Sequence, residues 1–215
     1  MKIVLILFSI IITGCSLKTP ANEWQYKSSN AFSSYTKNFL MANDVLARND
    51  LSRAIKHAKK SADLTQLAKI YLGECALNIS VGIEDDCKKY INISSLVNND
   101  SLNTYYNFIN LSIKKEQVKD LPKNYQSYTY NLLKRDYKSA NQDIMSISKT
   151  TSSFLCASLI KEDIELTTRE KIISLASYNG YKRVILFWLN ESLKNNQNQK
   201  NIKNIRKKIS ILTKP

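Results

Sequence analysis

The stretch LTQLAKIYLGECALNI, which runs from Leu64 to Ile79, decides the fold class. Its apolar positions follow one another at alternating steps of three and one: Leu64, Leu67, Ala68, Tyr71, Leu72, Cys75, Ala76 and Ile79. An α-helix turns once in about 3.6 residues, so this spacing gathers the apolar side chains into one broad stripe. A half-buried strand would need strict alternation instead. The stretch therefore predicts a helix with one buried face.

The rest of the chain shows the same periodicity and few turn residues. Its 215 residues include only 4 Gly and 3 Pro, whereas an all-β domain needs turn signals roughly every 8–12 positions. We therefore expect an all-α fold with a single domain over residues 23–215, built of antiparallel helical hairpins. The expected helices are 23–48, 50–62, 64–80, 84–97, 100–112, 123–135, 137–148, 151–162, 168–179, 181–195 and a basic C-terminal helix at about 199–212. The first break is expected at Arg48–Asp50, because Asn and Asp favour helix caps.

Residues 1–15 have the pattern of an export signal that ends at a cysteine. Lys2 precedes an apolar run, Ile3 to Ile12, that only Ser9 interrupts. This run is too short to cross a bilayer as a mature helix, and it matches the apolar core of a secretory signal. Its end, Ile12-Thr13-Gly14-Cys15, resembles the lipobox of bacterial lipoproteins.

The lipobox resemblance implies an anchor and a location. It implies that residues 1–14 are a lipoprotein signal peptide, that Cys15 carries fatty chains such as palmitate, and that residues 15–22 are a lipidated tether. Ser16 in place of Asp resembles enterobacterial lipoproteins sent to the outer membrane. The expected location is therefore the cell envelope, lipid-anchored at the outer membrane and facing the periplasm. An ordinary cleaved secretory signal with a chance cysteine is the alternative.

Four segments resemble the second helix of a tetratricopeptide repeat (TPR), and two of them, Asn179–Leu193 and Asp85–Leu96, match more weakly. NDLSRAIKHAKKSADL (Asn49–Leu64) has Asp50 where the family has its turn and Ala54 where it has a small residue. RDYKSANQDIMSI (Arg135–Ile147) repeats the pattern with Asp136 and Ala140. A small residue at that place lets two helices cross closely, and Leu72-Gly73 resembles the family's Leu-Gly pair with the same use.

The resemblance implies helical hairpins stacked as a short, irregular TPR-like array, because a single hairpin cannot bury its apolar face alone. The array is irregular because the turn anchors Asp50, Asp86, Asp136 and Gly180 lie 36, 50 and 44 residues apart. An irregular all-α domain without repeats is the alternative.

If Cys15 is lipidated, three thiols remain in an oxidising compartment, so at most one internal disulfide can form. Cys75 and Cys87 are the favoured pair, because Gly82 between them suggests a tight reversal of the chain. The alternative is that all three, Cys156 included, are small buried apolar residues. A zinc site is not expected, because the chain has a single His and no CxxC spacing. No cofactor is expected either.

The composition favours binding over catalysis. The net charge of +14 falls to +13 when residues 1–14 are removed, which attracts anionic surfaces. Export makes nucleic acid a poor partner. The single His57 lies among cations with nothing to orient it as a catalytic base. The acidic runs 84–86 and 162–165 fit helix caps better than a pair of catalytic carboxyls, which must face each other across a cleft.

We therefore expect a membrane-anchored, non-catalytic scaffold or assembly factor whose partners are the membrane, through its lipid anchor, and an envelope protein. Known lipoproteins with such repeats serve as secretin pilotins or in outer-membrane assembly machines, so the resemblance implies a role of this kind. The candidate partner-binding residues are the tyrosines Tyr105, Tyr106, Tyr128 and Tyr130; the alternative, favoured for most tyrosines of the chain, is that they are large core residues with a polar tip. The alternatives are a basic-surface binder of anionic glycan or lipid and a peptidoglycan-acting enzyme. The basic C-terminal helix is expected to cap the array rather than lie on the membrane.

Overall fold

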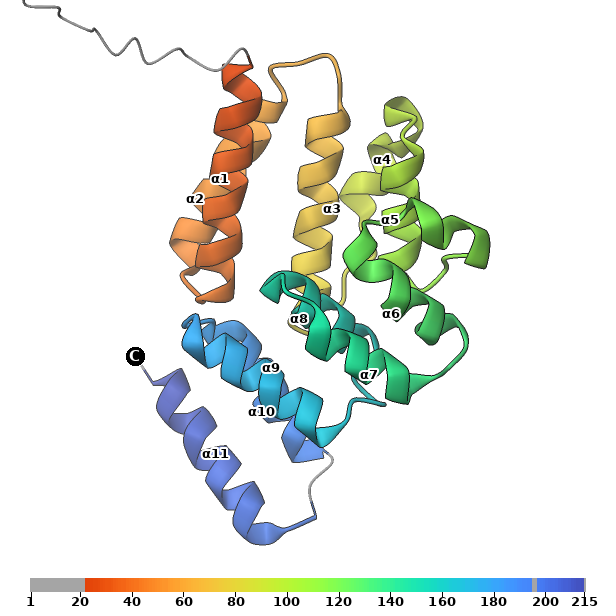
Figure 1. Cartoon of the computed structure of the whole chain (residues 1–215). Helices are drawn as coiled ribbons and strands as arrows, with labels where there is room; N and C mark the ends of the chain where they lie inside the picture. Colours follow the sequence, from red (N-terminus) through yellow and green to blue (C-terminus); the bar gives the residue numbers. More distant parts are fainter. Residues whose placement is uncertain (1–21, 195–196, 215) are drawn as a thin grey trace, which may run out of the picture.

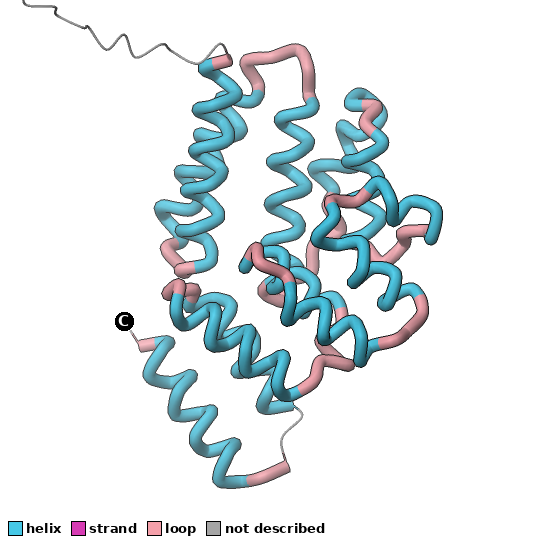
Figure 2. The backbone as a smooth tube through the Cα atoms, viewed as in Figure 1, coloured by secondary structure: helices cyan, strands magenta, loops and turns pink. Residues whose placement is uncertain are grey.

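A computed structural model describes residues 22–194 and 197–214 of the chain. Within that part every regular element is a helix, as expected from the periodicity (Figure 1, Figure 2). The elements are α1 (Glu23–Leu40), α2 (Asp44–Ala58), α3 (Thr65–Ser80), α4 (Lys88–Val97), α5 (Asp100–Ile109), the 3-10 helix η1 (Lys115–Asp120), α6 (Lys123–Leu133), α7 (Tyr137–Ser146), α8 (Thr150–Leu159), α9 (Leu166–Tyr178), α10 (Lys182–Lys194) and α11 (Gln199–Thr213).

The helices form a curved, repeat-like array that turns back on itself. The α1–α2 hairpin stands at one side, α3 occupies the middle, and α4 and α5 lie beyond it (Figure 1). The chain then returns through α6, α7 and α8 to α9 and α10, which lie below the α1–α2 hairpin in this view. Helix α3 packs against α8 at the centre, and its sequence stripe supplies a large part of the core.

Gly73 lets α1 approach α3, in the way the sequence suggested. A Cβ atom at Gly73 would lie 2.5 Å from Cζ of Phe32. The Phe32 ring therefore occupies the space that any larger residue at position 73 would need. The close packing of the first hairpin on the central helix depends on this missing side chain.

In the described part of the chain, five helices end in the same backbone turn. The turn residues have left-handed backbone angles and are Ala42, Gly82, Leu111, Arg135 and Gly180. In each turn, the N–H of the following residue donates to a carbonyl five positions earlier, at 2.8–3.0 Å. This is the Schellman arrangement, which satisfies helix carbonyls that would otherwise lack partners.

In four of these turns the accepting carbonyl belongs to an asparagine whose side chain bonds to the next segment. Nδ2 of Asn38, Asn78 and Asn131 donates to a carboxylate oxygen of Asp50, Asp85 and Asp143, respectively, each at 2.7 Å. Nδ2 of Asn107 reaches Oε1 of Gln117 at 3.4 Å. The same residue type thus ends one helix and positions the next segment of the chain, and this pairing is the repeated unit of the array.

The fifth turn replaces this polar pair with an apolar one. In the α1–α2 and α6–α7 hairpins the asparagine stands four residues before the turn residue and the aspartate eight residues after it. The corresponding residues around Gly180 are Ala176 and Trp188, and both have no exposed surface. The α9–α10 hairpin is therefore held by packing at the place where the other two hairpins use a hydrogen bond.

The expected first break at Arg48–Asp50 is wrong. The expected helix 23–48 is two helices: α1 ends at Leu40, the chain turns at 41–43, and α2 runs through positions 48–50. Asp50 is buried within α2, where it accepts from Asn38 and pairs with Arg53, so it does not cap a helix. The expected helix 84–97 also begins later, at Lys88, because the preceding acids lie in a loop. The basic helix expected at about 199–212 is α11.

One arginine joins the two ends of the array. Arg183 on α10 donates from Nε to the carbonyl of Phe39 at 2.8 Å and pairs with Asp44 at the start of α2. Its guanidinium also lies over the Phe39 ring, 4.5 Å from the centroid. The first turn and the last hairpin are therefore locked together, and the array closes on itself.

The first turn yields a stability prediction. Ala42→Gly should raise the free energy of unfolding by about 0.5–1 kcal/mol, because glycine removes the steric cost of a left-handed alanine. Ala47→Gly, in the interior of α2, should lower it by about 1 kcal/mol or more. Chemical denaturation of the two variants measures both effects. Equal losses of stability would contradict the turn assignment.

Candidate functional site

A wide groove lies where α11 meets α9 and α10. It has a volume of about 830 Å³. Its residues are Leu166, Arg169, Glu170 and Ile173 of α9, Leu189 and Ser192 of α10, and Gln197, Asn201, Asn204, Ile205 and Lys208 at and before α11. The floor is thus aliphatic and the rims carry amides and charges, as in sites that bind a segment of another protein.

The groove exists because α11 packs loosely. Its principal neighbour is α10, and none of its own residues is buried. The isoleucines Ile202, Ile205 and Ile209 are half-buried on one side of this helix. Helix α11 therefore covers only part of α10. The sequence predicted a cap that closes the last apolar face, and α11 closes that face only where its isoleucines contact α10.

The charges around the groove are mostly unpaired within the described residues. Helix α11 carries five exposed cations and no acid; the cations are Lys200, Lys203, Arg206, Lys207 and Lys208. None of them forms an ion pair with another described residue. Across the groove, Nε of Arg169 is buried without a hydrogen-bond partner. Arg169 lines the groove, so its guanidinium adds a positive charge to this surface.

The four tyrosines expected to bind a partner do not share one surface. Tyr128 has no exposed surface, and its hydroxyl donates to the carbonyl of Cys156 at 2.7 Å, so it belongs to the core. Tyr106 packs beside Tyr90, with ring centroids 5.5 Å apart. Tyr130 is 37% exposed on α6. Tyr128 therefore follows the alternative of a core tyrosine, and a role of the others in partner binding stays a prediction.

Tyr105 instead lines a second, smaller cavity between α1, α3 and α8. This cavity has a volume of about 360 Å³. Its wall is rich in hydroxyl groups, from Ser29, Ser33, Thr36, Ser80, Tyr105, Tyr125 and Thr151. Burial of the phenol, together with neighbouring Tyr125, raises the pKa of Tyr105 well above its usual value. The hydroxyl therefore stays protonated, and it offers a hydrogen bond rather than a catalytic base.

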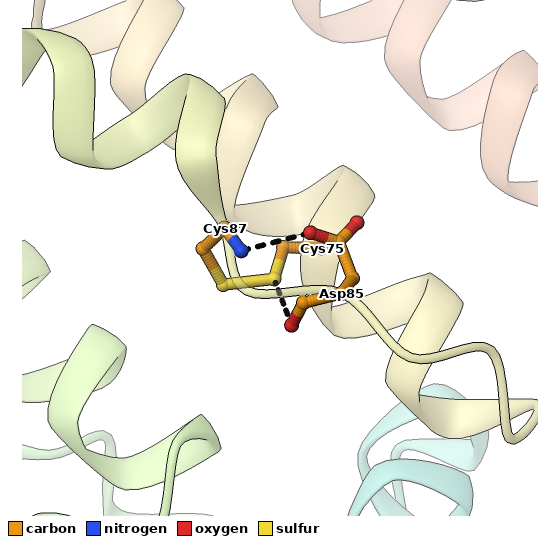
Figure 3. Close-up of side chains that lie close together, drawn as sticks. All are labelled: Cys75, Asp85 and Cys87. Carbon is orange, nitrogen blue, oxygen red and sulfur yellow. Dashed lines mark hydrogen bonds between the residues drawn. A yellow bond between two sulfur atoms is a disulfide. The ribbon is translucent and has the colours of Figure 1, made fainter.

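Cys75 and Cys87 form a disulfide, the pair that the sequence favoured (Figure 3). Asp85 lies between them: its carboxylate accepts the N–H of Cys87 at 2.8 Å, and its carbonyl oxygen is 3.7 Å from Sγ of Cys75. The ligand atoms of these three residues lie close to one another, but they could bind a metal ion only if the disulfide were reduced to two thiolates. In the disulfide the cluster is a staple that ties α3 to the start of α4. Cys156 is free and fully buried.

The acids at 84–86 organise the loop before α4. Asp86 accepts the N–H of Lys88 at 3.2 Å and pairs with its ammonium at 2.9 Å. These contacts with Lys88 lower the pKa of Asp86. A general acid of a glycan-cleaving enzyme requires the opposite shift. The contacts hold the loop in front of α4, whose N-cap residue is Cys87.

Comparison with known proteins adds no relative: no protein-family model, no curated protein and no solved structure matches the chain. The tetratricopeptide resemblance therefore rests on short sequence patterns, and the structure supports the coarser description of an all-helical, repeat-like array. No described helix is long and apolar enough to cross a membrane. Cys15, the expected lipidation site, lies outside the described residues.

The disulfide yields a second prediction. Replacement of both Cys75 and Cys87 by Ser should lower the free energy of unfolding by about 3 kcal/mol, because the crosslink closes a loop over a sequence separation of 12. Denaturation with and without a reductant measures the loss. The reductant should destabilise the parent chain and leave the double variant unchanged. A reductant effect of equal size on both chains would contradict the assignment.

Proposed function

We propose that the protein is a lipid-anchored, non-catalytic scaffold of the cell envelope that binds an acidic, apolar segment of an envelope protein. The anchor is Cys15, on the strength of the lipobox resemblance. The binding site is the groove between α9, α10 and α11. A location at the outer membrane, facing the periplasm, is inferred from the sequence pattern after the cysteine.

The observation that carries this function is the incomplete packing of α11. A helix that only completed a core would bury its apolar stripe, whereas α11 leaves an aliphatic groove open beside it. Large open grooves with apolar floors and polar rims mark interaction sites on otherwise monomeric proteins. The groove is long and lined from three helices, which suits an extended or helical peptide better than a small molecule.

Charge defines the chemistry of the partner. Lys208 and Arg169 in the groove lining, with the other cations of α11 nearby, favour a segment with carboxylates. Leu166, Ile173 and Leu189 favour aliphatic side chains on the opposite side of that segment. An acidic amphipathic helix meets both requirements, with its apolar side on the floor and its acids toward α11.

The anchor has a direct test. Cells that produce the full chain should incorporate labelled palmitate into it, and Cys15→Ala should abolish the labelling and release the protein from the membrane fraction. The Cys75→Ser/Cys87→Ser variant is the matched control, because it also removes thiols and should keep the label. Labelling that persists in Cys15→Ala would refute the lipid anchor.

The groove has a separate test by site-specific photocrosslinking in intact cells. A photoreactive phenylalanine at Leu166, which is 64% exposed at the groove, should capture one envelope protein. The same residue at Tyr178, which is 90% exposed on the same helix and outside the groove, is the control. Capture from both positions, or from neither, would contradict a partner in the groove.

Charge reversal then tests the chemistry of the captured partner. Lys208→Glu, within the groove, should weaken binding about tenfold, which corresponds to roughly 1.4 kcal/mol. Lys203→Glu changes the net charge equally but does not line the groove, so its effect should be clearly smaller. Titration of the purified partner measures both affinities. Equal losses would indicate attraction to the overall charge rather than binding in the groove.

A further inference from the structure

The end of the molecule where α1 begins is also the end where α2 finishes. The two helices pack antiparallel, and Ser28 Oγ near the start of α1 donates to the carbonyl of Ala54 near the end of α2 at 2.9 Å. In Figure 1 the end where α1 begins lies at the top, and α11 lies at the opposite end of the molecule. The segment that leads to Cys15 therefore joins the domain at the α1–α2 end.

A small pocket on this hairpin is lined by hydrogen-bond donors and positive charges. Lys27, Asn30 and Ser34 of α1 and Arg53 and His57 of α2 surround a volume of about 350 Å³. Lys27 pairs with Glu23 and Arg53 pairs with Asp50, so each cation keeps further donor hydrogens for another acceptor. Nδ1 of His57 is buried without a hydrogen-bond partner. The pocket is thus rich in donors and short of acceptors.

Three further lysines follow His57 or precede it directly in the sequence, and two of them, Lys56 and Lys60, act electrostatically on His57. Lys56, Lys59 and Lys60 are exposed at the end of α2 and just beyond it, and none of them forms an ion pair with another described residue. Of the nearby acids, Glu23 pairs with Lys27 of the pocket itself, and Asp63 accepts the N–H of Thr65 at 2.9 Å, so the cations outnumber the acids. The positive charges therefore dominate this end.

His57 responds to these surroundings. Burial of its ring and the positive charges of Lys60, Lys27, Lys56 and Arg53 lower the pKa of His57. A phosphate group in the pocket would offset the mutual repulsion of these cations and would accept from Lys27 and Arg53.

We infer that the pocket of Lys27, Arg53 and His57, with the three lysines near His57 in the sequence, binds the phosphate groups of anionic phospholipids in the membrane that holds the anchor. This inference rests on the proposed anchor at Cys15. From Cys15, seven further residues reach Asn22, a span of at most about 25 Å when fully extended. The α1–α2 end thus stays near the headgroups, where polybasic surfaces bind anionic lipid. The α11 groove then faces away from the bilayer, free for a partner.

Lysine acetylation on vesicles tests this orientation. The full lipidated chain is reconstituted into vesicles of phosphatidylcholine alone or of phosphatidylcholine with about one-third phosphatidylglycerol. Mass spectrometry then gives the acetylation rate of each lysine. Lys27, Lys56 and Lys60 should react at least fivefold more slowly on the anionic vesicles, whereas Lys203 and Lys207 on α11 should be unchanged. High salt should remove the protection.

A matched pair of variants separates the pocket from general charge. Lys56→Gln/Lys59→Gln/Lys60→Gln should return the acetylation rate of Lys27 to within twofold of its rate on neutral vesicles. The triple Gln variant of Lys203, Arg206 and Lys207 removes the same charge and should keep the protection of Lys27. Circular dichroism should show unchanged helix content in both.

Each contrary result has a distinct meaning. A chain that does not stay with either kind of vesicle would overturn the anchor and the proposed function with it. A chain that stays on both kinds with equal acetylation rates, or with protection on α11 instead, would overturn the lipid site alone. Protection of Lys27 by soluble glycerol phosphate on neutral vesicles, equal to that on anionic ones, would overturn the membrane as its source of phosphate.

Discussion

The hydrogen bond from an asparagine at the end of one helix to an acceptor in the next segment is the interaction on which this array depends. It appears at Asn38, Asn78, Asn107 and Asn131, each of which stands four residues before a left-handed turn residue. The turn fixes where the chain reverses, and the side chain fixes how the following segment lies. Because the backbone carbonyl of the same residue closes the turn, one residue type controls both features.

The periodicity of apolar residues was enough to predict the fold class, but the helix boundaries depended on contacts that the sequence does not display. Ala42, Leu111 and Arg135 adopt backbone angles usually left to glycine, so the first reversal carried no local signal. Asp50 is a residue type that favours helix caps, but it is buried and accepts a hydrogen bond from Asn38. At Asp50, the tertiary hydrogen bond with Asn38 outweighed the local preference for a helix cap.

The candidate sites were predictable to different degrees for similar reasons. The Cys75–Cys87 pair is close in sequence and separated by Gly82, so local geometry was a sound guide. The α11 groove needs α9, α10 and α11 placed together, and the sequence did not predict it, because the basic, amphipathic pattern of this helix was interpreted as a cap. Tyr105 and Tyr128 have similar neighbours in sequence, yet one lines a cavity and the other is core. The spacing of residues in the sequence shows which side chains share one side of a helix, but it does not show which other element packs against that side.

The contact of Arg183 with the first turn has a consequence for biogenesis. An open stack of repeats can mature from one end, since each unit needs only its neighbour. Here the partner of Phe39 and Asp44 stands 139–144 positions later in the chain. If the chain is exported amino end first, as proposed, its first hairpin leaves the membrane well before Arg183, the residue that secures it. On that route the hairpin stays incompletely docked until almost the whole chain has followed, and a chaperone has that interval in which to bind it.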